Sequence, residues 1–287
     1  MSQQIETAFV KQYASTLSHL VQQKGSRLRA TVRVEPLIGR EGFFDQIGAT
    51  EAQPRTTRHG QSPVVSTPHG RRRVAGQDFE WGDLIDGQDR VRMLIDPASS
   101  YLQSAMYALG RKIDDVIIAA ASGTAFTGET GTTAVALPAG QKIAVGGTGL
   151  TVAKLRTAKR MLDEKEVDPE EPRTFACTAE QIDNLLGDTQ VTSSDFNTVK
   201  ALVEGTIDTY MGFKFVRTER LAKPTTDRLC LAYAQSGLLL AINKDINGNI
   251  APRADKSFAT YAYACLTAGA TRMEEEKVVE VACLETS

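Results

Sequence analysis

The chain has 287 residues, of which 41% are hydrophobic and 24% charged, with a formal net charge of −2. This length and composition indicate a globular protein with one large or two modest cores. The near-neutral charge argues against a dedicated nucleic-acid-binding protein. The longest apolar runs, 116–121 and 238–242, are too short to span a bilayer, and no apolar signal segment opens the chain. We therefore expect a cytoplasmic protein with no membrane partner.

The first elements form an amphipathic helix and a strand. Apolar residues at spacings of three and four predict a helix over 6–24, which Gly25 ends. Alternating apolar residues predict a strand over 27–34. The chain then leads, as an extended arm, into a region of unusual charge order.

Between residues 54 and 89 the charges are sorted by sign, and we call this stretch the sign-sorted segment. It holds few large apolar residues and many Gly and Pro residues, so it buries too little surface to order itself. Residues 25–111 also contain no lysine, and planar guanidinium groups suit bidentate pairing with carboxylate or phosphate. We expect the segment to dock on another copy of the chain, where arginines meet carboxylates; a flexible surface loop is the alternative. The predicted subunit-interface residues are Arg55, Arg58, Arg71, Arg72, Arg73, Asp78, Glu80, Trp81, Asp83 and Asp86.

A long helix follows the sign-sorted segment. Asp96 and Pro97 are typical of a helix start, and a single apolar stripe continues to Gly123. Residues 123–149 are rich in Gly, Thr and Ala, which predicts a mobile connection between domains. A phosphate-binding loop at Gly146–Gly149 is rejected, because no G-x-x-x-x-G-K-[ST] motif is present.

From residue 150 the pattern alternates between helix and strand, which indicates an α/β unit over about 150–250. Thr151 caps one helix, and Thr178 with Gln181 predicts a capping box. Further elements are a helix over 197–204 and strands over 173–177, 213–218 and 229–233. Two last strands, 258–273 and 277–284, are predicted to pair as a C-terminal hairpin.

The sequence offers no chemistry for catalysis. The four cysteines lie far apart in apolar runs, which indicates buried small side chains rather than a metal or redox site. The three histidines lie in the first helix and the sign-sorted segment, and the acids of 163–171 are typical of a solvated helix end. We expect no enzyme activity, catalytic residue, cofactor or metal.

Several segments, in order, resemble the major capsid proteins of tailed bacteriophages. They are Ile182-Asp183-Asn184-Leu185-Leu186-Gly187-Asp188, Val191-Thr192-Ser193-Ser194-Asp195, Asn197-Thr198-Val199-Lys200-Ala201-Leu202, Met211-Gly212-Phe213-Lys214-Phe215, and Thr148-Gly149-Leu150-Thr151 with Lys154-Leu155-Arg156. The resemblance implies an α+β tailed-phage capsid fold in five parts. These are an N-terminal arm (1–50), an E-loop (51–95), the spine helix of a P domain with its connection (96–149), an axial A domain (150–250) and the C-terminal P-domain strands (251–287).

The resemblance also implies partners and a place. Such proteins form the hexamers and pentamers of an icosahedral shell that encloses double-stranded DNA, so we expect a virion protein assembled in the host cytoplasm, with a portal protein. About fifty residues precede the E-loop, so we expect a separate scaffolding protein or none rather than a fused segment. Some members crosslink subunits through an E-loop lysine; this loop has none, so we expect no such bond.

Two alternatives stay open from the sequence. The first is the shell of a bacterial nanocompartment, which shares the fold and encloses a protein cargo. The second takes Arg55–Arg73 as a DNA-binding arm, which the five nearby acids disfavour.

Overall fold

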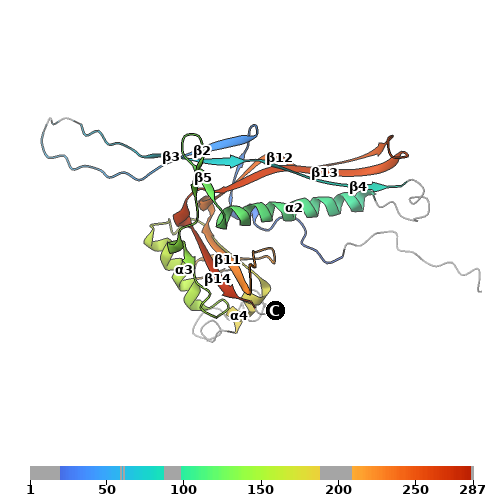
Figure 1. Cartoon of the computed structure of the whole chain (residues 1–287). Coiled ribbons are helices and arrows are strands. Elements are labelled where there is room, and N and C mark those ends of the chain that lie inside the picture. The colour runs from blue at the N-terminus through green and yellow to red at the C-terminus, as the bar shows by residue number, and fades with distance from the viewer. Residues whose placement is uncertain (1–19, 59, 61, 87–97, 188–208, 286–287) are drawn as a thin grey trace, which may run out of the picture. The chain divides into compact units, whose positions relative to one another are not determined.

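The computed structural model describes residues 20–58, 60, 62–86, 98–187 and 209–285 (Figure 1). These residues form two compact units. Unit 1 comprises 1–25, 78–111 and 244–266, and unit 2 comprises 26–77, 112–243 and 267–287, in each case as far as the structure describes them. Three long elements contribute residues to both units: α2 (Ala98–Ser122), β12 (Leu238–Arg253) and β13 (Ala259–Arg272).

Unit 1 contains the N-terminal part of α2 (98–111), the C-terminal part of β12 (244–253) and the N-terminal part of β13 (259–266). It also contains β4 (Gln77–Ile85), except for the first residue of that strand. In the sheet, β13 lies between β12 and β4. The helix packs closely on this sheet, because a Cβ atom added at Gly248 would overlap the side chain of Leu102. A Cβ atom at Gly82 would likewise overlap the ring of Tyr261, so β4 needs glycine where it meets β13.

Unit 2 contains an α/β layer around a six-stranded sheet. The strand order is β7 (Lys142–Ile143), β14 (Val278–Leu284), β11 (Asp227–Ala234), β8 (Arg173–Cys177), β10 (Phe213–Arg217) and β9 (Thr209–Tyr210). Every residue of β8 is buried, as expected for a central strand with neighbours on both edges. The helices α3 (Val152–Glu164) and α4 (Ala179–Leu186) complete this layer, and α3 contacts β14.

Unit 2 also holds a hairpin that carries the basic half of the sign-sorted segment. Strands β2 (Glu41–Ile47) and β3 (His69–Ala75) pair antiparallel, with Phe43 opposite Arg73. Beyond β3 follow β5 (Ala125–Thr127) and β6 (Thr133–Val135). Strand β1 (Arg33–Pro36) pairs separately, parallel to the first residues of β12. All described residues from 47 to 70 are exposed.

Most predicted elements are confirmed where the structure describes them. The long helix runs from Ala98 to Ser122, and the Thr151 hydroxyl accepts the Lys154 N–H at the start of α3. The predicted strands of the α/β unit are present as β8, β10 and β11. Residues 6–19 of the first predicted helix and the helix over 197–204 lie outside the described residues, and residues 20–24 are not helical.

The predicted C-terminal hairpin is wrong. Both strands exist, but β14 pairs with β11 and β7, whereas β13 pairs with β12 and β4. The short turn at Glu275–Lys277 therefore sends the chain from one sheet into another. The apolar runs identified the strands correctly, but run composition does not specify which strand becomes the neighbour.

Two smaller predictions also need correction. Residues 29–31 form a 3-10 turn, so the strand predicted over 27–34 begins only at Arg33. The capping box at Thr178 and Gln181 does not form, although α4 begins where expected. The Thr178 hydroxyl instead donates to Glu285, and Gln181 accepts the Leu150 N–H and donates to the Leu284 carbonyl. Leu150 lies 31 residues from Gln181 in the sequence, Leu284 lies 103 residues from Gln181, and Glu285 lies 107 residues from Thr178.

Candidate assembly surface

The structure divides the sign-sorted segment between different strands. Arg55 and Arg58 lie on the exposed β2–β3 connection, and Arg71, Arg72 and Arg73 lie in β3 of unit 2. Asp78, Glu80, Trp81 and Asp83 lie in β4 of unit 1, and Asp86 follows that strand. The segment is thus two strands with a connection, not one loop, since β3 and β4 each gain hydrogen bonds from a sheet.

Arg71 and Arg73 lie on the outer face of the β2/β3 hairpin beside carboxylates of the same chain. Arg71 Nε is 2.7 Å from Asp45 Oδ1, and its guanidinium lies 5.5 Å from the centroid of the Phe43 ring. Arg73 is 2.6 Å from Glu41 Oε1, and this hydrogen bond lowers the pKa of Glu41. Because these side chains are partly exposed, solvent screens both pairs, and each contributes little to folding.

Arg72 points to the other face and is buried. Its guanidinium donates to both oxygens of Glu275, at 2.8 and 2.6 Å, and Nε donates to the Met273 carbonyl at 2.9 Å. Its apolar surroundings include Leu37, Val74 and Met273. Arg72 thus has a carboxylate partner in its own chain, and its place at a subunit interface stays a prediction.

The acidic strand β4 presents most of its side chains to solvent. Glu80 accepts a hydrogen bond of 3.0 Å from the Tyr263 hydroxyl, and Asp83 accepts one from the Leu84 N–H. Trp81 is half-buried, whereas Leu84 is 42% exposed. Whether these residues and the arginines face another subunit stays a prediction, although their exposure agrees with such a role.

Sequence patterns did not reveal Arg272, the most buried charged side chain of unit 2. Its guanidinium donates to the carbonyls of Ala121, Gly123 and Val135, and Nε lies 3.6 Å from Glu275. Burial lowers the pKa of Arg272, and the neighbouring carboxylate opposes this effect. An arginine at the end of an apolar strand is expected at the surface. Nothing near Arg272 in the sequence therefore indicated that its side chain is buried.

The glycine-rich loop at 145–149 holds a cation and not a phosphate. Lys154 Nζ donates to the carbonyls of Val145, Thr148 and Gly149 and to that of Ala282 in β14, at 2.7 to 3.0 Å. Burial lowers the pKa of this lysine. Converging carbonyl oxygens would repel a phosphate, so the loop is a structural link between α3 and the sheet.

The described residues contain no group of three or more His, Cys, Asp or Glu side chains that could hold a metal ion. All four cysteines are free; Cys177, Cys230 and Cys283 are buried, as predicted, and Cys265 is half-buried. Burial raises the pKa of Cys177 to about 12, so its thiol is protonated and unreactive at neutral pH.

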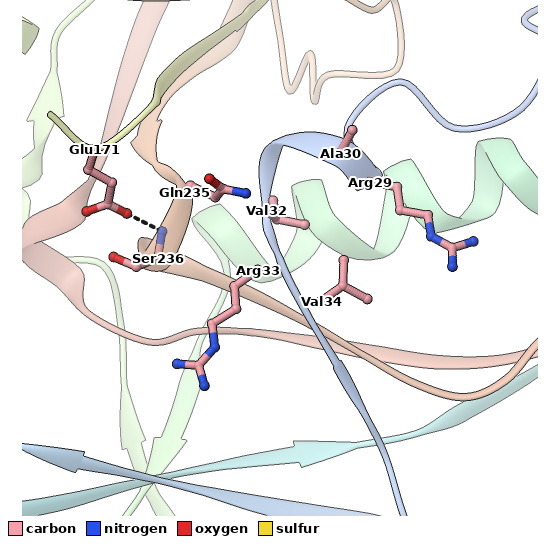
Figure 2. Close-up of a pocket in the computed structure, with 8 residues that line it drawn as sticks. All are labelled: Arg29, Ala30, Val32, Arg33, Val34, Glu171, Gln235 and Ser236. Atoms are coloured by element: carbon pink, nitrogen blue, oxygen red, sulfur yellow. Dashed lines mark hydrogen bonds between the residues drawn. The ribbon is translucent and has the colours of Figure 1, made fainter.

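One hollow of unit 2 lies beside β1 (Figure 2). Its volume is about 520 Å³, and Ala30, Val32 and Val34 provide its apolar lining. Arg29 and Arg33 lie on either side of Val34 in this view, and Glu171 accepts the Ser236 N–H at the far wall.

The comparisons with known proteins decide the family. A family model described as phage capsid protein matches residues 5–285, nearly the whole chain. The chain belongs to the phage capsid protein family. A search of curated proteins finds no match.

Solved structures of similar fold are also capsids. The capsid of the cyanophage P-SCSP1u is 17% identical with a TM-score of 0.74, covering 98% of this chain and 94% of the other. The capsid of Ralstonia phage GP4 is 11% identical with a TM-score of 0.76, covering 97% and 96%. A structure from Mycobacterium phage Che8 is 17% identical with a TM-score of 0.71, covering 95% and 96%. The α+β capsid fold predicted from the sequence is thereby confirmed.

This capsid protein is therefore a structural component of the virion, not an enzyme. The family match does not favour the nanocompartment alternative. Among the described residues, no helix is long and apolar enough to cross a membrane.

Proposed function

We propose that this capsid protein is the major subunit of an icosahedral head shell, arranged in hexamers and pentamers around double-stranded DNA. The family match over residues 5–285 carries the proposal. The exposed β2–β3 connection supports it, because an extension with no core of its own gains order by lying on a neighbour.

In this proposal the parts of the chain take the roles expected from the sequence. The β2/β3 hairpin with its connection is the E-loop, α2 with β12 and β13 forms the P domain, and the six-stranded sheet with α3 and α4 is the core of the A domain. The sheet takes in β7 and β14, which lie outside residues 150–250, so the A domain draws on three stretches of sequence.

The remaining partners belong to assembly in the host cytoplasm. A portal protein occupies one vertex, and a separate scaffolding protein, if any, directs curvature. The enclosed DNA is held without sequence-specific contacts. The described E-loop residues carry no lysine, which supports a shell without covalent bonds from this loop.

Expression of the chain alone and with its phage's scaffolding protein tests the proposal. Electron microscopy of the sedimented fraction should show closed shells of uniform diameter, and denaturing gels of those shells should show monomers. A chain that stays monomeric under both conditions would overturn the proposal, and covalent ladders mapped to residues 48–68 would overturn the part on crosslinking.

A further inference from the structure

Among the described residues the three sheets end in six edge strands, and two of these, β1 and β4, are the edges of the same four-stranded sheet. In unit 2, β1 pairs only with β12, in parallel, with Val34 opposite Leu240. In unit 1, β4 pairs only with β13. Open strand edges are places where another chain can add by backbone hydrogen bonding, and natural proteins otherwise cover or block them.

On its open edge, β1 has one backbone N–H group that can pair with a further strand. The Leu37 N–H donates to the Ile242 carbonyl, so Leu37 and, two residues before it, Glu35 turn their backbone groups toward β12. Alternate residues of a strand direct these groups to opposite sides, so Val34 and Pro36 face outward. Proline has no N–H, and Val34 therefore provides both the donor and an acceptor. Such a short edge needs side-chain contacts for specificity.

The side chains beside this edge are basic and apolar. Arg29 and Arg33 flank the hollow of about 520 Å³, whose lining includes Val32 and the 42% exposed Val34 (Figure 2). Arg33 lies 2.9 Å from Glu35, but this pair is on the surface and is readily exchanged for a better partner. The residues 27–36 carry three arginines and one acid.

The edge strand β4 has the opposite character. It carries Asp78, Glu80 and Asp83 with no base, and all three are exposed. Glu80 and Leu84 share one face of the strand, because side chains four residues apart point the same way. Leu84 is an exposed apolar side chain of a size that the hollow beside β1 can accept.

We propose that β4 of one copy docks along the open edge of β1 of a second copy. Leu84 then enters the hollow, while Glu80 on the same face of β4 and Asp83 on the opposite face each lie near one of the arginines Arg29 and Arg33. This inference rests on the proposed shell function and names one contact within it. Because two different surfaces meet, the contact is heterologous, which is the kind that builds rings of subunits. Opposite charges favour this pairing over β1 with β1 or β4 with β4.

The test reverses each charged edge separately and then both together. The variants are Arg29→Glu with Arg33→Glu, Glu80→Arg with Asp83→Arg, and the four-residue combination. Particle yield is measured by sedimentation and electron microscopy. We expect each two-residue variant to lower the yield by about tenfold or more, because like charges then face each other, and the combination to restore it.

A matched control carries Arg40→Glu and Arg156→Glu, two exposed arginines outside the hollow, and should assemble normally. Thermal unfolding of the unassembled subunits must give wild-type midpoints, so that lost particles report lost contact. Normal particles from either two-residue variant, or a combination that stays defective, would overturn this contact. Both results leave the shell function intact, whereas a wild-type chain without particles would overturn the shell function itself.

Discussion

The Nη2 group of Arg72 donates to both carboxylate oxygens of Glu275, at 2.8 and 2.6 Å, although 203 residues separate the two side chains. Only 8% of the Arg72 side chain and 17% of the Glu275 side chain are exposed. Arg272 Nε lies 3.6 Å from the same carboxylate. This ion pair links β3 of the β2/β3 hairpin to the turn at Glu275–Lys277, between β13 and β14.

Reversal of the charge at Arg72 should destabilise the subunit itself. Arg72→Glu places two carboxylates together in a buried site, and we expect the free energy of unfolding to fall by about 3–5 kcal/mol. The matched variant Arg71→Glu removes the solvent-screened pair with Asp45 and the contact with the Phe43 ring, and it should destabilise the subunit far less. Urea unfolding of unassembled subunits measures both; equal effects of the two variants would refute the buried role of Arg72.

Asp114 should hold the start of the described arm. This fully buried carboxylate accepts the N–H groups of Arg27 and Leu28 and the Ser26 hydroxyl. Asp114→Ala leaves these donors without an acceptor, and we expect a loss of about 2–4 kcal/mol and faster amide hydrogen exchange at residues 26–28. Asp115→Ala, which removes the partly exposed pairs with Arg220 and Lys112, is the control. Unchanged exchange at residues 26–28 in Asp114→Ala would contradict the prediction.

Lys154 should tie the 145–149 loop to β14. Lys154→Met keeps the length of the side chain but leaves four carbonyl oxygens without their donor, so we expect a loss of about 2–4 kcal/mol. Lys159→Met, on the same helix and half-buried, should change stability by less than about 0.5 kcal/mol. Calorimetric midpoints that are the same for the two variants would argue against the link.

Glu285 makes stability depend on pH in the acid range. Arg228 donates to both oxygens of this buried carboxylate and lowers its pKa from 4.5 to about 2, a shift that burial opposes. A carboxylate whose pKa is depressed on folding contributes stability above its unfolded pKa and loses it as pH falls through the folded value. We expect about 2 kcal/mol to disappear between pH 5 and about pH 2.

The control for this prediction is Glu285→Gln, which has no carboxylate to titrate. Its unfolding free energy should be lower at pH 7 and should approach that of the wild type near pH 2. Wild-type and variant curves that stay parallel from pH 7 to pH 2 would show that Glu285 is not the titrating group.

Local patterns located the described helices α2, α3 and α4 and the strands β8, β10, β11, β13 and β14, but not the strands β2, β3 and β4 or the long strand β12. The single apolar stripe located α2, and the Thr151 cap located the start of α3. Each of these signals depends only on residues that are close together in the sequence. The pairing of β14 with β11 was missed, since an apolar run fits several neighbours equally well. Asp114 and Arg272 were missed because a charged residue within an apolar pattern gives no indication of distant backbone partners.

The same limit applies to the candidate interface. The sequence showed the unusual order of the charges, but it could not show that β3 and β4, which only Gly76 separates, belong to different sheets. The arginines of β3 therefore pair with carboxylates of their own chain, whereas most side chains of β4 are exposed.

Electron microscopy of the purified chain, assembled with its phage's scaffolding protein where one is required, shows whether the chain builds a shell. We expect closed icosahedral shells of uniform diameter, whose reconstruction places each chain in a hexamer or pentamer. A chain that remains monomeric, or that forms only irregular aggregates under all assembly conditions, would contradict this expectation.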